Sequence, residues 1–226
     1  MAIGTNPGGG TLSGTTTVSA VSGVATFSNL SIDKTGTGYT LTGASAGLTG
    51  ATSAGFNITP AAASKLAFTV QPANAVAGVS IAPAVQVTVQ DAFGNTVTGS
   101  SASVTVAIGT NPGGGTLSGA TTVSAVSGVA TFSNLSIDKA AAGYTLTASS
   151  GALTPAASSA FTISHAAASR LVFSVQPTNA TAGVMELPAI SSDGWTVKAS
   201  FEAAAGLMLN VTEVAPVSGA DVAVSV

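Results

Sequence analysis

The sequence contains no cysteine and very little charge. Charged residues make up 6% of its 226 residues, with five Lys or Arg and eight Asp or Glu, against about 25% in an ordinary soluble domain. Without cysteine there is no disulfide framework, so stability has to come from packed apolar cores. Five scattered basic side chains are too few to neutralise a row of phosphates, which argues against a nucleic-acid partner.

Long apolar runs are missing as well. No stretch approaches the roughly 20 apolar residues of a spanning helix, so we expect no membrane insertion within this chain. No basic and apolar leader opens the sequence, and Met1 falls inside a repeat, so we interpret the chain as a fragment of a longer protein. Apolar residues still amount to 46%, which is enough to build cores. Thr, Ser, Gly, Ala and Val dominate, and these residues favour strands and tight turns.

A long internal repeat determines the organisation. Residues 2–79 align without a gap to residues 107–184, and 58 of the 78 pairs are identical. The offset of 105 residues is far above the roughly 20–50 of solenoid units and suits a whole sandwich domain. We predict a partial repeat with the later strands only at 1–59 (the partial copy), a complete repeat at 60–164 (the complete copy), and at 165–226 the start of a further repeat that passes into a divergent β segment.

The complete copy consists of short segments that alternate apolar and polar residues, as half-buried antiparallel strands do. The alternating apolar positions are Leu66, Phe68 and Val70; Val85, Val87 and Val89; Val104, Val106 and Ile108; Tyr144, Leu146 and Ala148; and Phe161 and Ile163. Turns are expected at Asp91–Asn95, Asn111–Gly115 and Ser127–Gly128. About seven strands between turns predict a two-sheet sandwich. One core is expected to contain Phe68, Val87, Phe132, Tyr144, Leu146, Phe161 and Ile163.

Three sequence motifs follow one another along the complete copy. Val85–Asn95 ends in Asp-x-x-Gly-Asn, Ser127–Phe132 contains Gly-Val-Ala-Thr, and Gly143–Ala148 reads Gly-Tyr-Thr-Leu-Thr-Ala. This order resembles the bacterial immunoglobulin-like (Big) domains of the invasin and intimin family. The resemblance covers 61–164 fully and 2–59 in part. It implies tandem immunoglobulin-like β-sandwich domains in a multi-domain surface protein, and it implies no ligand.

The chemistry-bearing residues form no catalytic pattern. His165, the only histidine, aligns with Pro60 at a repeat junction, so we read it as a linker residue and not as part of a Ser-His-Asp triad. Asp33 and Asp138 are copies of one position and lie a repeat apart, so they cannot flank one glycosidic bond. We predict that the protein is not an enzyme, and we assign no catalytic, cofactor-binding or metal-binding residues.

Three segments contain residues of types that also occur in ligand sites. The loop Asn6–Gly10 is rich in glycine but lacks the Lys and Ser or Thr of a phosphate loop, so we expect a flexible hairpin loop. Asp91 with Asn95, and Asp138, offer oxygen atoms to calcium. Calcium takes six to eight oxygen ligands, and the local acids are too sparse for that. An Asx-type turn explains Asp91 better.

The two ends of the chain leave alternatives open. Residues 1–59 and 165–226 are truncated units, or they pair with each other to complete one sandwich. Trp195, the only tryptophan, alternates with polar residues in an expected strand, which favours a core position. Exposed, it would instead offer a platform for a sugar ring.

The composition and the repeat together predict a structural or adhesive region, a stalk or spacer, of a bacterial cell-surface or secreted protein. Its location would be extracellular, and its partner a protein or glycan of a host or neighbouring cell. One alternative is an extracellular glycan- or protein-binding module in which residues 185–226 carry recognition. The other is an accessory domain of a polysaccharide-degrading enzyme.

Overall fold

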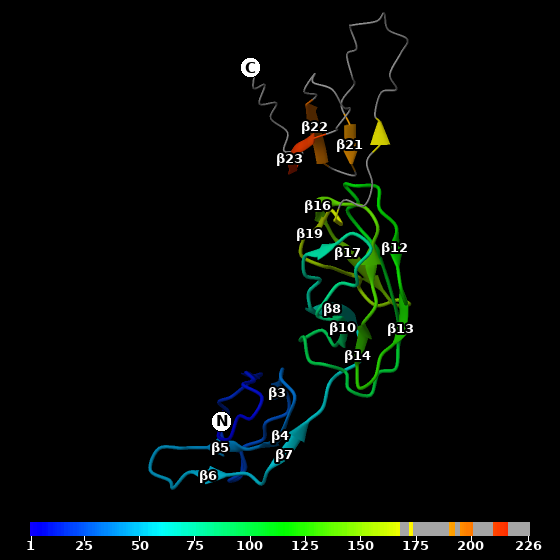
Figure 1. Ribbon diagram of the computed structural model, residues 1–226. Helices are drawn as coiled ribbons and strands as arrows, with labels where there is room; N and C mark the ends of the chain where they lie inside the picture. The colour runs from blue at the N-terminus through cyan, green and yellow to red at the C-terminus, as the bar shows by residue number, and fades with distance from the viewer. Residues whose placement is uncertain (168–171, 174–189, 193–194, 201–209, 217–226) are drawn as a thin grey trace, which may run out of the picture.

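The computed structural model describes residues 1–167, 172–173, 190–192, 195–200 and 210–216. Every regular element in this part of the chain is a β-strand, and no helix occurs in it. The prediction of an all-β fold is therefore confirmed. Figure 1 shows the strands of the partial copy in blue and cyan and those of the complete copy mainly in green.

The strands of the complete copy are short and closely spaced. They are β8 (Lys65–Val70), β9 (Ala75–Val76), β10 (Val85–Gln90), β11 (Ser103–Ile108), β12 (Leu117–Ser118), β13 (Thr122–Ser124), β14 (Val129–Phe132), β15 (Ser136–Ile137), β16 (Ala141–Tyr144), β17 (Leu146–Ser149), β18 (Ala156–Ala157) and β19 (Phe161–Ser164). The two larger sheets have the orders β14-β10-β8 and β13-β11-β17-β18, and the smaller ones are β16-β19-β9 and β12-β15. All pairs in these sheets are antiparallel except β19 with β9.

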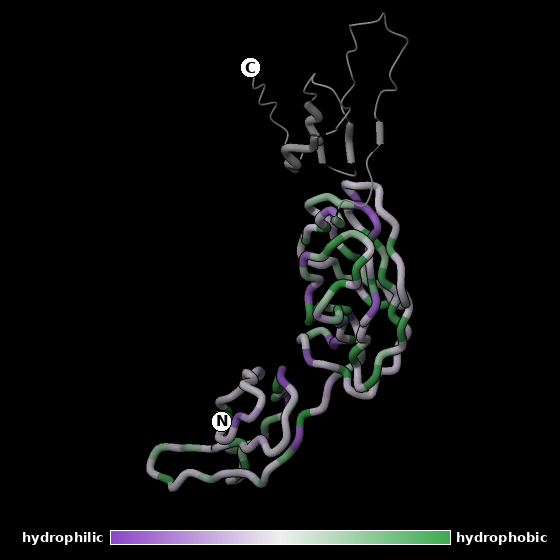
Figure 2. Tube along the Cα trace, in the orientation of Figure 1, coloured by the Kyte–Doolittle hydropathy of each residue, from purple (hydrophilic) through white to green (hydrophobic). Residues whose placement is uncertain are grey.

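One core joins these sheets. Its buried members are Leu66, Ile81, Val85, Val87, Val89, Val104, Val106, Ala125, Ala130, Phe132, Leu135, Ile137, Tyr144, Leu146, Ala148, Phe161 and Ile163. The predicted shared core is confirmed, although Phe68 is only partly buried against it. Apolar segments recur along the whole complete copy in Figure 2, as expected when alternate residues of many strands face one interior.

The partial copy has the counterparts of the later strands. They are β1 (Ala2–Ile3), β2 (Leu12–Ser13), β3 (Ser31–Ile32), β4 (Gly36–Tyr39), β5 (Leu41–Gly43), β6 (Ala51–Thr52) and β7 (Phe56–Ile58). They form the sheets β1-β5-β6, β2-β3 and β4-β7. Tyr39 is fully buried and lies against Phe56 at a ring-centroid distance of 6.2 Å, and Tyr144 and Phe161 repeat this pair at 6.1 Å.

The backbone of four strands is described beyond residue 167. These strands are β20 (Val172–Phe173), β21 (Ile190–Ser192), β22 (Trp195–Ser200) and β23 (Asn210–Pro216), in the antiparallel order β20-β21-β22-β23. The expected strand at Trp195 is therefore present. The side chain of Trp195, on which the choice between a core position and a sugar platform depends, lies outside the described residues.

The structure corrects two sequence-based expectations. The Asn6–Gly10 loop and its copy Asn111–Gly115 are not hairpins, because β1 pairs with β5 while β2 pairs with β3, so the loop crosses from one sheet to another. Thr88 lies between the apolar positions Val87 and Val89, so the alternation predicts that it faces away from the core, but it is 2% exposed. It lies on the central strand of its sheet, where its Oγ1 is 2.8 Å from Oγ1 of Thr69 on β8, so the buried hydroxyl is satisfied.

The predicted repeat boundaries fall between strands. β7 ends at Ile58 and β8 begins at Lys65, while β19 ends at Ser164. The division into 1–59, 60–164 and 165–226 stays a prediction.

Candidate functional site at the junction of the two copies

The most elaborate polar cluster is the loop that follows β10. The Oδ1 of Asp91 accepts hydrogen bonds from the backbone N–H of Phe93 (3.0 Å) and of Asn95 (2.9 Å). These two bonds close the Asx-type turn that the sequence predicted. Gly94, at a φ of +82°, supplies the left-handed residue that turns the chain back.

The second carboxylate oxygen of Asp91 ties this loop to the start of the complete copy. Its Oδ2 accepts from the N–H of Ala61 (3.0 Å) and from Nδ2 of Asn95 (2.9 Å). Burial of this fully enclosed carboxylate raises its pKa, but the hydrogen bonds from Asn95, Ala61 and Phe93 outweigh burial and hold the pKa of Asp91 below its ordinary value. Asp91 is therefore a buried carboxylate whose charge is stabilised by N–H donors.

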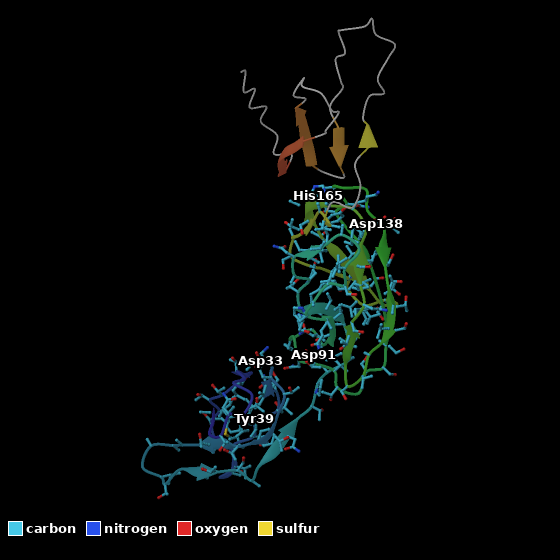
Figure 3. The ribbon with its side chains drawn as sticks, in the orientation of Figure 1. Asp33, Tyr39, Asp91, Asp138 and His165 are labelled. Atoms are coloured by element: carbon cyan, nitrogen blue, oxygen red, sulfur yellow. The ribbon has the colours of Figure 1, made fainter. Side chains whose placement is uncertain are left out.

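The side chain of Asn95 connects this loop to the partial copy through hydrogen bonds. Its Nδ2 donates to the carbonyl oxygen of Asp33 (2.9 Å), and its Oδ1 accepts from the N–H of Thr35 (3.1 Å). Next to it, Nζ of Lys34 donates to the carbonyl oxygen of Phe93 (2.7 Å). Asp33 and Asp91 accordingly lie at the same junction in Figure 3. These three bonds join residues that are about 60 positions apart.

The turn that receives Asn95 is held in shape from within the partial copy. The hydroxyl of Tyr39 donates to the carbonyl oxygen of Lys34 (2.9 Å), and Oδ1 of Asp33 accepts from the N–H of Thr11 (2.6 Å). The Asn6 side chain bonds both N and O of Gly10 at 2.8 Å, which orders the loop packed beside that tyrosine. The receiving turn is thus preformed.

The oxygen atoms of this cluster are already engaged in hydrogen bonds within the chain. Both carboxylate oxygens of Asp91 accept N–H groups, so they present no unpaired oxygen to a calcium ion. In the part of the chain that is described, no three His, Asp or Glu side chains gather in a way that could hold a metal. Asp138 is exposed and bonds the N–H of Thr116 (2.6 Å), and His165 is exposed at the end of the complete copy.

Sequence reasoning singled out Asp91 and Asn95 but missed their partners. It treated the Asp-x-x-Gly-Asn motif as a turn and as a mark of resemblance, and it gave Lys34 and Phe93 no role. A signal was present, because Asp33 and Lys34 recur unchanged as Asp138 and Lys139 while the next three residues vary.

Comparisons with known proteins add no identity. No protein-family model and no curated protein matches this chain. Among the described residues, no helix is both long enough and apolar enough to span a membrane.

Proposed function

We propose that this chain belongs to a stalk or spacer region, structural or adhesive and without catalysis, of a bacterial cell-surface or secreted protein. Its repeat copies would be immunoglobulin-like sandwich units joined in tandem. The observation that carries the proposal is the junction, where Asn95 and Phe93 of one copy bond Asp33, Lys34 and Thr35 of the copy before it. A stalk requires such bonds because a free linker would let consecutive units fold back on each other.

The physical argument rests on how the junction is built. Asn95 is only 9% exposed and has both polar atoms of its amide engaged. Breaking the junction while Asn95 stays buried would leave Oδ1 and one N–H of Nδ2 unpaired, at a cost of about 1–3 kcal/mol, while the bond from Nδ2 to Asp91 would remain. Because Asp91 orients Asn95 through two further bonds, the amide is already in position before the copies meet.

The proposal predicts a fixed distance between the two copies. Because the chain has no cysteine, spin labels can be placed on Ser28→Cys and Ser133→Cys, two exposed and equivalent positions. Electron–electron distance measurements should give a narrow distribution, which Asn95→Ala should broaden. Asn74→Ala serves as the matched control, since Asn74 bonds Thr162 inside the complete copy. A broad distribution in the unmutated chain would overturn the spacer function.

A further inference from the structure

The complete copy contains a second version of the receiving turn, at Asp138–Ala140. We propose that this turn is a docking surface that fits the Asp-x-x-Gly-Asn loop of another repeat unit placed directly after the complete copy, where this chain has residues 165–226, which lack that loop. The inference rests on the proposed spacer function. It extends that function by assigning both ends of a repeat unit: a loop that binds at one end and a turn that receives at the other.

The groups used at the existing junction are all retained in the second turn. The junction bonds the carbonyl oxygen of residue 33, the amino group of Lys34 and the backbone N–H of residue 35. At an offset of 105 these become Asp138, Lys139 and Ala140. Alanine at position 140 in place of threonine at position 35 preserves the contact, because Asn95 accepts a hydrogen bond only from the backbone N–H of Thr35.

The second turn also has the same internal support. The hydroxyl of Tyr144 donates to the carbonyl oxygen of Lys139 at 2.9 Å, the same bond and distance as between Tyr39 and Lys34. Oδ1 of Asp138 accepts from the N–H of Thr116 at 2.6 Å, as Asp33 does from Thr11. A turn that is already shaped loses little conformational freedom on docking.

The two turns differ in whether they are covered. Asp33 and Lys34 are half-buried, whereas Asp138 and Lys139 are exposed. Figure 3 places Asp138 at the end of the complete copy opposite to Asp91. The open turn therefore lies where a following unit would be attached, beside the exposed residue His165.

This sequence supplies no second loop of the required type. Asp-x-x-Gly-Asn occurs once, at 91–95, and the residues 105 positions beyond Asp91, Phe93 and Asn95 are Thr196, Lys198 and Ser200. The occupant is thus another unit with the motif, and we expect it to act only when tethered. Three hydrogen bonds are too few to hold a free partner, whereas a tether raises its effective concentration to about the millimolar range.

The test lengthens the chain by one unit. A second copy of residues 60–164 is inserted after Ser164 of the full chain. Amide hydrogen exchange is then measured at Ala140 of the original copy, which precedes the insert. We expect the Ala140 N–H to exchange at least about ten-fold more slowly than in the unlengthened chain. Asn95→Ala in the inserted copy should restore the original rate, while the Thr35 N–H stays protected. An unchanged Ala140 rate beside a folded insert, judged by protection of its β10 amides, would overturn the inference.

A second variant tests the receiving turn without any insertion. Thr35→Ala, Gly36→Ala and Thr37→Ala together give the partial copy the residues found at 140–142. If the two turns are equivalent receivers, the narrow distance distribution between the labels at 28 and 133 should persist and should still depend on Asn95. Loss of the narrow distribution in this variant alone would overturn the inference and leave the spacer function standing. A broad distribution already in the unmutated chain would overturn both.

Discussion

Residues 16–34 and 121–139 are identical in sequence, yet they adopt different structures. In the complete copy, 122–124 and 129–132 are the strands β13 and β14, whereas 17–27 contains no strand and only an isolated bridge from Val21 to Val24. Phe132 is 1% exposed and its counterpart Phe27 is half-buried. Local strand propensity is the same in both segments, so something outside them decides the outcome.

The deciding factor is the pairing partner. β13 pairs with residues 103–105 and β14 with 85–88, and residues 1–59 contain no counterpart of either. Features that depend on local contacts survive in both copies, including the turn in which Ser22 and Ser127 have φ of 49° and 50°. A strand of this composition therefore forms only where a neighbour supplies its hydrogen bonds and covers its apolar face.

The largest effect should come from the paired phenylalanines. Phe132→Ala should reduce the unfolding free energy of the complete copy by about 3–5 kcal/mol, because it empties a closed core. Phe27→Ala should have well under half that effect on the partial copy, since Phe27 lacks a covering sheet. In the full chain, amide hydrogen exchange of β10 reports the unfolding free energy of the complete copy, and exchange of β4 reports that of the partial copy. Equal losses would show that the two sites are equally packed.

Asp91, which has no counterpart in the partial copy, should come next. Asp91→Ala leaves four N–H donors without their acceptor, and we expect a loss of about 3 kcal/mol from the complete copy. Chemical unfolding, followed through backbone amide signals of each copy, would measure this loss of unfolding free energy. A loss confined to the partial copy would contradict the assignment of this loop.

The lowered pKa of Asp91 also predicts an acid dependence. Since its folded-state pKa lies below the unfolded value, the stabilisation is complete above the unfolded pKa of about 3.8 and is lost as pH falls through the folded value. The stability advantage of the unmutated chain over Asp91→Asn should therefore shrink as pH falls from about 5 to about 2. A constant advantage across that range would mean that the charge of Asp91 contributes nothing.

A smaller difference is expected at the matched hairpin glycines. Gly23 and Gly128 have φ of +80° and +81°, so alanine is strained equally at both. A Cβ at Gly128 would also lie 2.6 Å from the carbonyl oxygen of Val97, while a Cβ at Gly23 meets nothing within 4 Å. Gly128→Ala should thus cost about 1–2 kcal/mol more than Gly23→Ala, measured by thermal unfolding. Equal costs would place the hairpin of the complete copy away from Val97.

The smallest difference should be found between two serines. Oγ of Ser158 accepts from the N–H of Leu146 at 2.9 Å in a buried position, and Ser53 makes the same bond to Leu41 while exposed. Ser158→Ala should cost about 1–2 kcal/mol because it leaves a buried N–H unpaired, and Ser53→Ala a few tenths, because water replaces the hydroxyl. Denaturant midpoints of the two variants provide the comparison, and a reversed order would contradict it.

The sequence predicted what depends on periodicity. The alternation of Val85, Val87 and Val89 placed one face of β10 in the core, and Asp91 was correctly read as an Asx turn. It did not predict the burial of Thr88. A threonine whose hydroxyl is hydrogen-bonded inside the protein looks the same in the sequence as an exposed threonine. The role of Asn95 was also missed, since its contacts across the junction are with backbone atoms that every residue type has.

Amide hydrogen exchange at Ala20 and Ala125 tests the central claim most directly. The N–H of Ala125 donates to the carbonyl oxygen of Ala102 at 2.9 Å in the buried part of the complete copy, and the described structure gives the N–H of Ala20 no such acceptor. We expect Ala125 to exchange at least about a hundred-fold more slowly than Ala20, although the same residues surround both. Equal protection would contradict the account, because it would mean that this segment folds by its own sequence and not by its partner strands.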